Sequence, residues 1–197
     1  MRLIGQILLG VGLLFLAVVV IMHFRARNER SREETTLAAL RRTLTLTSGS
    51  FPPGGDMPIN CTCKGREVSP ALRWENVPNG TKSFVVLTTD YDVPTPAFPV
   101  FNLTHWMMYN LPASVRSLPE AVTPEQVRIL GGKIGKNSTG SLKYIGPCPP
   151  LGRHAYVFRV FALDSTLTFR DLPDRSELMD AMNRHILTYG ELTGYFQ

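Results

Sequence analysis

Five polar side chains stand at or near the ends of apolar segments, where small-ligand sites are commonly built. They are Asp90 and Asp92 after one segment, His105 before the next, and His154 and Tyr156 at the start of a third. Imidazole and phenol groups can donate hydrogen bonds to phosphate oxygens, and a carboxylate can orient an imidazole or accept from an ammonium group. This combination predicts a site for a small anionic or zwitterionic ligand.

A rigid connection precedes the third segment. The stretch from Gly146 to Gly152 reads GPCPPLG, with three prolines and two glycines. Proline restricts φ and removes a backbone donor, whereas glycine lets the backbone approach another group closely. His154 and Tyr156 follow at once, and their spacing of two places both side chains on one face of a strand.

Other chemistries have little support. The segment Gly131–Gly140 resembles a phosphate-binding loop, but Gly135-Lys136 is followed by Asn137 rather than Ser or Thr, and we expect a flexible surface loop. No Gly-x-Ser-x-Gly motif occurs, and no serine or cysteine is marked as a partner for either histidine. A hydrolase is therefore a weak alternative, and we expect no cofactor and no metal site.

The elements that must position these residues are mainly β. Thr43–Thr47 alternates with period two, and Ser83–Thr89, His105–Leu111 and Ala155–Leu163 are apolar runs of strand length. One late helix is predicted, with Asp174 and Glu177 forming a capping box and Leu178, Met182, His185 and Ile186 on one face. This order predicts a mainly β fold, an antiparallel β-sandwich with peripheral helices.

The N-terminus carries a candidate membrane anchor. Leu3–Phe24 is almost wholly apolar, and as a helix it would be about 33 Å long, enough to cross a hydrocarbon core. A cleaved signal peptide is the alternative, although no good cleavage site follows. We expect an anchor at 1–25, a basic amphipathic linker at 26–43 and a folded domain at 44–197, with Ser31-Arg-Glu-Glu34 capping a short helix or continuing the membrane helix.

The arginine distribution predicts the orientation. Six arginines follow the apolar run before residue 43, and only Arg2 precedes it. The positive-inside rule then places the domain on the cytoplasmic or matrix side of a single-pass membrane protein. Residues 51–197 carry fourteen basic against thirteen acidic side chains, so the domain has no basic excess for binding nucleic acid.

Cysteines and sequons add little at this point. Three cysteines leave one unpaired in any disulfide scheme, and we expect Cys61, Cys63 and Cys148 to be small, partly buried thiols. Four Asn-x-Ser/Thr sequons, at Asn60, Asn79, Asn102 and Asn137, matter only if the domain faces a secretory lumen.

The motifs taken in order resemble the phosphatidylethanolamine-binding protein family, in particular its bacterial and archaeal Raf-kinase-inhibitor-like branch. The matching motifs are Asp-x-Asp-x-Pro at 90–94, His105-Trp106 and Gly-Pro-Cys-Pro-Pro-x-Gly-x-His-x-Tyr at 146–156. The resemblance covers about 44–196 and implies an antiparallel sandwich with a small pocket for anions, typically phosphate-bearing head groups. Carried over by motif, the pocket residues are Asp90, Asp92, Pro94, His105, Gly146, Pro149, His154 and Tyr156, and the Gly146–Gly152 loop forms a wall.

Two positions depart from the family pattern. Tyr91 stands where the family usually has proline, and Ala155 stands where it usually has arginine. Arg153 lies two residues earlier and could point to the same strand face. We therefore expect a membrane-anchored, non-enzymatic domain that binds an anion or a phospholipid head group. The alternative is an accessory subunit of a membrane protein complex with a vestigial pocket.

Overall fold

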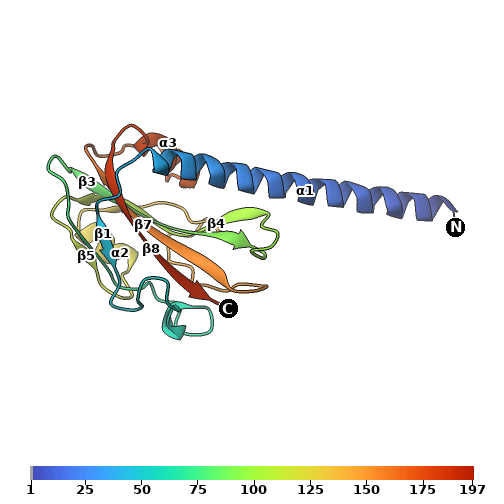
Figure 1. Cartoon of the computed structure of the whole chain (residues 1–197), viewed down its shortest axis with the longest axis horizontal. Helices are drawn as coiled ribbons and strands as arrows, with labels where there is room; N and C mark the ends of the chain where they lie inside the picture. The colour runs from blue at the N-terminus through green and yellow to red at the C-terminus, as the bar shows by residue number, and fades with distance from the viewer. Residues whose placement is uncertain (1) are drawn as a thin grey trace.

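The apolar segments form two antiparallel sheets in the computed structural model, which describes residues 2–197 (Figure 1). The smaller sheet has the order β1-β2-β5, and the larger has the order β6-β4-β3-β7-β8. The strands are β1 Thr45–Thr47, β2 Leu72–Glu75, β3 Ser83–Val93, β4 Phe101–Pro112, β5 Ser117–Leu118, β6 Lys133–Ile134, β7 His154–Leu163 and β8 Ile186–Phe196. The helices are α1 Arg2–Ala38, α2 Pro124–Ile129 and α3 Arg175–Met182, with a 3-10 turn at Ile59–Cys61. The prediction of a mainly β, antiparallel fold is confirmed.

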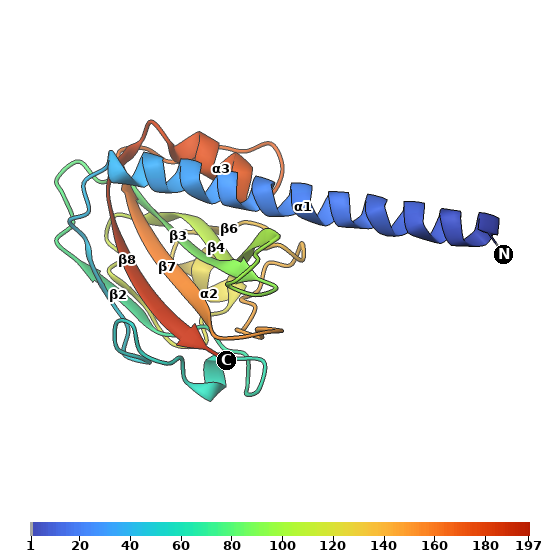
Figure 2. The same ribbon diagram turned by 45° about the vertical axis from the view of Figure 1, so that its right-hand side comes forward.

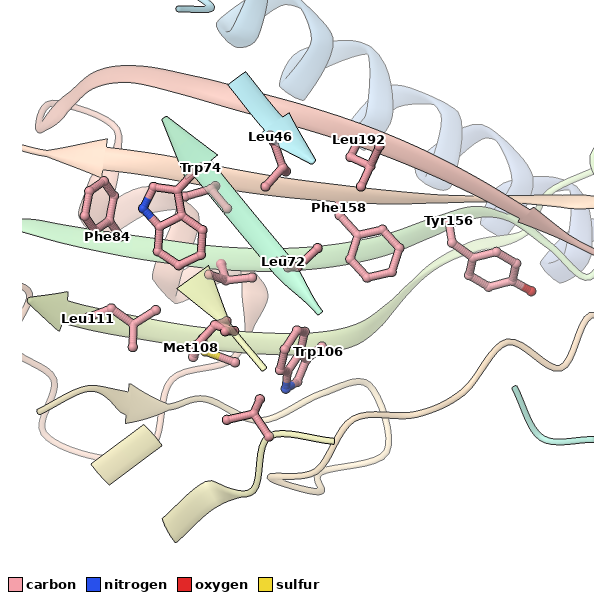
Figure 3. Close-up of a cluster of buried hydrophobic side chains, with 14 of the residues drawn as sticks. Leu46, Leu72, Trp74, Phe84, Trp106, Met108, Leu111, Tyr156, Phe158 and Leu192 are labelled. Atoms are coloured by element: carbon pink, nitrogen blue, oxygen red, sulfur yellow. The ribbon is translucent and has the colours of Figure 1, made fainter. Parts of the chain in front are cut away.

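Side chains of both sheets meet in one buried cluster (Figure 3). Leu46 and Trp74 come from the smaller sheet, whereas Phe84 and Phe158 come from neighbouring strands of the larger one. Because side chains alternate along a strand, Phe84 and Val86 of β3 and every second residue of β7 from Tyr156 to Ala162 enter this cluster. The same alternation carries Tyr156 to the end of the cluster, beside the predicted site.

The opposite face of the larger sheet is covered by helices. A second cluster joins Val85 and Phe161 of the sheet to Leu178 of α3 and to Leu37 near the end of α1. Figures 1 and 2 both show α1 running along this face beside α3 and then leaving the domain. The last part of α1 therefore packs against the sheet.

The helix α1 is continuous from Arg2 to Ala38. Its N-terminal half exposes apolar side chains and is long enough to cross a membrane. The predicted cap at Ser31 is not used, because residues 26–38 continue the same helix. Contacts with the domain begin where the apolar run ends: His23 Nδ1 lies 2.6 Å from the Pro99 carbonyl oxygen, and its ring stacks on Phe98 at a centroid distance of 4.0 Å.

A buried carboxylate joins α1 to the sheet. Glu33 accepts hydrogen bonds from Arg159 at 3.0 Å, from the Tyr91 hydroxyl at 2.6 Å, and from Arg175 of α3. Arg159 also donates to Glu191 of β8 at 2.8 Å. Burial and the Glu33 charge raise the pKa of Tyr91, so that its hydroxyl stays protonated and donates. Two carboxylates thus balance two guanidinium groups inside the interface.

Several boundaries differ from those expected. β3 continues through Asp90 and Asp92, and β4 begins before His105, so these residues lie inside strands rather than at their tips. The Asp174 cap is present, but α3 ends at Met182, and Ile186 begins strand β8, which the sequence did not indicate.

The segment expected to be a flexible surface loop is ordered. Lys133 and Ile134 pair with β4, and Asn137 is buried, with its side-chain amide donating to the Lys143 carbonyl oxygen at 2.8 Å.

The cysteine prediction is wrong for two of the three residues. Cys63 and Cys148 form a disulfide across 85 residues of sequence, and only Cys61 is a buried free thiol. Burial raises the pKa of Cys61 to about 11, which makes this thiol a poor nucleophile. The spacing of the cysteines carried no signal for this pairing.

Replacing Glu33 with Ala is expected to destabilise the fold by about 3–5 kcal/mol, because it removes the carboxylate that pairs with Arg175 and leaves the buried Arg159 with Glu191 alone. Chemical denaturation of the full-length protein in detergent measures this loss. The matched control is Glu34→Ala: that side chain is 58% exposed, against 5% for Glu33, and pairs with Arg30 on the surface. Its loss should cost less than about 1 kcal/mol. Equal losses of stability in the two variants would contradict the role of Glu33 in joining α1 to the sheet.

Candidate functional site

Asp90 is the centre of the candidate site. Its position on β3 directs the side chain toward the interior face, where it is 2% exposed. One carboxylate oxygen accepts the Asp92 backbone N–H at 2.7 Å. The other lies 2.8 Å from His154 Nδ1 and 4.0 Å from His105 Nε2. The structure therefore brings Asp90, Asp92 and both predicted histidines together.

His154 orients the carboxylate rather than pointing into free space. Its Nδ1 faces Asp90, and its Nε2 faces the Leu151 carbonyl oxygen at 3.2 Å. Both partners are acceptors, so the two bonds form together only when both ring nitrogens carry a proton. His154 then uses all of its donors within the protein. That His154 contacts a ligand stays a prediction.

His105 has the opposite character. Its Nδ1 donates to the Ile145 carbonyl oxygen at 2.7 Å, while its buried Nε2 has no hydrogen-bond partner among the described residues. Burial lowers the pKa of this imidazole and outweighs the nearby Asp90 charge. The ring is therefore neutral at pH 7 and presents a free lone pair at Nε2.

Tyr156 supplies the complementary group. Its ring lies edge-on to that of His105, with centroids 5.1 Å apart, and its buried hydroxyl is also unpartnered among residues 2–197. Burial and the carboxylates of Asp90 and Asp92 raise the pKa of Tyr156, so that the hydroxyl keeps its proton. The site thus contains one acceptor without a partner, His105 Nε2, and one donor, the Tyr156 hydroxyl, which lies beside the Asp90 carboxylate but outside normal hydrogen-bond geometry.

The loop before β7 is held by covalent and polar contacts. Cys148, next to Pro149, is bonded to Cys63, and the Gly146 N–H donates to Glu67 at 3.1 Å. A Cβ on Gly146 would lie 2.8 Å from the Glu67 side chain, so only glycine fits. The Gly146 N–H is thus paired within the protein, and a contact of its backbone with a ligand stays a prediction. Glu67 is a site residue that sequence reasoning missed, because no motif marks it.

The other wall is the β3–β4 connection. It begins with a cis peptide bond between Val93 and Pro94. A Cβ placed on Gly152 would lie 3.5 Å from Pro96, so this connection and the loop before β7 lie side by side. Pro94 and Pro149 therefore stand in the two loops that flank the cluster, and their contact with a ligand stays a prediction.

Both departures from the family pattern point away from the cluster. The Tyr91 hydroxyl bonds Glu33 on the helix-covered face. The Ala155 backbone N–H donates to Asp92 at 2.9 Å. Arg153 pairs with Asp56 at 2.7 Å and packs over the ring of Tyr195, the strand partner of Ala155. Neither substitution removes a group from the Asp90 cluster.

No hydroxyl or thiol nucleophile is paired with a histidine of the polar cluster in the part of the chain that the structure describes. Across residues 2–197, no Ser, Thr or Cys side chain is hydrogen-bonded to His105 or His154. Within the same range, no three His, Cys, Asp or Glu residues are grouped to hold a metal ion. Two grooves lie along α1, with volumes of about 660 and 490 Å³. The residues of the cluster, Asp90, His105, His154 and Tyr156, are at most 2% exposed, so the cluster lies below the protein surface.

Comparison with known proteins places this arrangement in a family context. The family model described as phosphatidylethanolamine-binding protein matches residues 47–197 and leaves α1 outside the match. A UPF0098 protein of Methanothermobacter thermautotrophicus is 35% identical over 155 residues, which cover 78% of this chain and 99% of that protein. The crystal structure of a phosphatidylethanolamine-binding protein homologue from Chlamydia trachomatis aligns with a TM-score of 0.71 at 33% identity, covering 79% of this chain and 98% of the other. Escherichia coli YbcL gives a TM-score of 0.70 at 28% identity, with the same coverage.

His105 is expected to remain neutral at pH values where an unperturbed histidine, with a pKa of about 6.5, is half protonated. Below that pH the unfolded chain binds a proton that the folded chain excludes. The contribution of His105 to stability is therefore complete above about pH 6.5 and is lost as the pH falls below it. Long-range ¹H–¹⁵N spectra of the labelled protein measure the protonation, and His105→Gln identifies the signal. A proton on Nε2 at pH 7 would contradict this prediction.

Proposed function

Because this chain belongs to the phosphatidylethanolamine-binding protein family, we propose that it is a membrane-anchored domain that binds a phosphate-bearing head group without turning it over. The proposed scaffold is a β-sandwich, and the proposed site is the Asp90 cluster. The family match and the intact cluster support this function. The missing pairing between a nucleophile and a histidine favours binding over hydrolysis.

The observation that carries the proposal is the pair of unpartnered atoms, Tyr156 Oη and His105 Nε2. Buried polar atoms in native proteins are nearly always hydrogen-bonded, so an orphaned pair facing one cluster is characteristic of a ligand site. A phosphate monoester in its monoanionic form has both matching groups. A charged oxygen accepts from Tyr156, and the P–OH donates to His105.

The same pairing determines the pH dependence. An organic phosphate loses its second proton at a pH of about 6. Above that value the ligand has no hydroxyl for the His105 lone pair, so affinity should fall as the pH rises. The ammonium group of phosphoethanolamine can in addition bind the carboxylate of Asp92, which is partly exposed.

Calorimetric titration of the full-length protein with phosphoethanolamine in a maltoside detergent tests the proposal. Tyr156→Phe and His105→Ala each remove a hydrogen bond to a charged ligand, and affinity should fall about 10- to 100-fold. Tyr189→Phe and His185→Ala, outside the cluster, should leave affinity unchanged. Absence of binding by the parental protein would show that the site is vestigial.

The proposed anchor is the N-terminal half of α1. A cleaved signal sequence has a similar composition and is the competing assignment. Burial of His23 and Ala26 against the domain supports the anchor, because the helix is packed across the end of its own apolar run. Removal of the apolar segment by cleavage near this point would disrupt those contacts.

The two indicators of orientation disagree. The arginines after the span predict the cytoplasmic or matrix side, whereas the bond between Cys63 and Cys148 favours an oxidising compartment. We give the disulfide more weight, because it holds the loop that flanks the site. Arg30 and Arg42, in contrast, pair with glutamates of this chain, and that role accounts for part of the arginine excess. We therefore propose that the domain faces an oxidising compartment.

Translation with microsomes tests this orientation. Asn79 is exposed and should be glycosylated in the lumen, whereas the buried Asn137 should remain unmodified. Acid-quenched alkylation under denaturing conditions should label Cys61 alone before reduction. An unglycosylated chain with all cysteines labelled would place the domain on the side that the arginines predict.

An accessory role in a membrane protein complex is the second candidate. The 660 Å³ groove between α1 and α3 favours it, because charged side chains of both signs, including Arg32 and Asp180, line a recess that a partner segment could fill. Blue-native electrophoresis of mildly solubilised membranes separates the two candidates. Migration only as a 22.0 kDa chain in its micelle would reject the accessory role.

A further inference from the structure

We propose that the end of the domain that carries the Asp90 cluster is a bilayer-contacting surface. This surface consists of the β3–β4 connection with Phe98 and Phe101, the neighbouring Leu151, and the arginines that follow the apolar run. The partner is the head-group layer of the membrane that holds α1. The inference rests on the proposed anchor and goes beyond it, because it specifies how the domain sits on the bilayer.

The first argument is the level at which α1 meets the domain. A helix rises 1.5 Å per residue, so the run from Ile4 to Phe24 is about as long as a hydrocarbon core is thick, roughly 30 Å. His23, at the end of this run, is bound to Pro99 and stacked on Phe98. The β3–β4 connection is therefore fixed at the level where hydrocarbon gives way to head groups.

The second argument is rigidity. The helix has no break between the apolar run and Glu33, and Glu33 pairs with Arg159 of the sheet and with Arg175 of α3. Asn102 also donates to the Ala26 carbonyl oxygen at 3.2 Å, one turn after the contact of His23. Both Figure 1 and Figure 2 show α1 leaving the domain past the β3–β4 connection, at the end where β7 begins. The domain therefore cannot turn this end away from the membrane.

The third argument is the composition of this end. Phe98 is 39% exposed, Phe101 41% and Leu151 63%. The loops that carry them lie side by side, because Gly152 and Pro96 are in van der Waals range. Aromatic residues favour the interface, and exposed arginines beside a span interact with lipid phosphates. Arg25 and Arg27 occupy that position on α1.

This placement has a consequence for the ligand. Asp90, His105 and Tyr156 lie just behind the two loops that would touch the bilayer. A head group of the surrounding lipid is then closer to the site than any solute in free solution. Among membrane lipids, one with a terminal phosphate monoester carries the P–OH that His105 requires, so the ligand source is accordingly such a lipid of the anchoring membrane.

Tryptophan scanning in proteoliposomes tests the surface. The parental tryptophans, Trp74 and Trp106, are buried and give a constant background. In vesicles that contain lipid spin-labelled near the glycerol backbone, Phe98→Trp and Leu151→Trp should lose most of their added fluorescence. Ile129→Trp is the matched control: position 129 is 75% exposed, and Gly131, two residues later, lies against Pro112 at the far end of β4, so its emission should be unaffected.

The outcomes separate this inference from the proposed function. Emission at positions 98 and 151 that is as resistant to quenching as that at position 129 would overturn the bilayer-contacting surface, as would equal quenching at all three positions. Failure of the protein to float with the vesicles would instead refute the anchor. Phosphoethanolamine titration of the Phe98→Trp and Ile129→Trp variants reports on the Asp90 cluster independently, because neither residue is hydrogen-bonded to the cluster, whereas the Leu151 carbonyl oxygen is a partner of His154.

Discussion

The alternation of side chains along β3 is the constraint on which the rest of the arrangement depends. Successive residues of a strand point to opposite faces, so Asp90 and Tyr91 serve two different structures. Asp90 enters the interior face and organises the histidines, whereas Tyr91 enters the outer face and bonds Glu33 of α1. A single strand therefore links the candidate site to helix α1.

Much of the fold could be predicted from the sequence, because its signals are local. The runs at Ser83 and Ala155 have strand length and composition, and the Asp174–Glu177 pair is a capping box that the structure contains. Strand β8 was missed, because its apolar residues are interrupted by glycines and polar residues. The extension of β3 through Asp90 was missed for a related reason: pairing with β7 as far as Asp90, and with β4 on the other side, outweighs the low strand propensity of aspartate.

The site residues were identifiable by type and order, but their chemical roles were not. His105 and His154 are equivalent in the sequence, and only the surroundings distinguish them. The His154 ring faces two acceptors inside the protein, whereas the His105 ring is neutral and keeps the lone pair of Nε2 without a partner. Contacts between distant segments, such as Glu67 with Gly146 and Cys63 with Cys148, leave no periodic trace in a single sequence.

The unbroken helix has a mechanical consequence. When a flexible linker joins a domain to its membrane anchor, the orientation of the domain does not depend on the tilt angle of the anchor. Here α1 and the larger sheet form one rigid unit, because Glu33, which lies beyond the end of the apolar run, pairs with both Arg159 and Arg175. Membrane helices commonly tilt by about 20°, and the tilt changes with bilayer thickness. In a chain anchored in this way, a change in thickness would rotate the whole domain and alter how closely its loops press on the lipid surface.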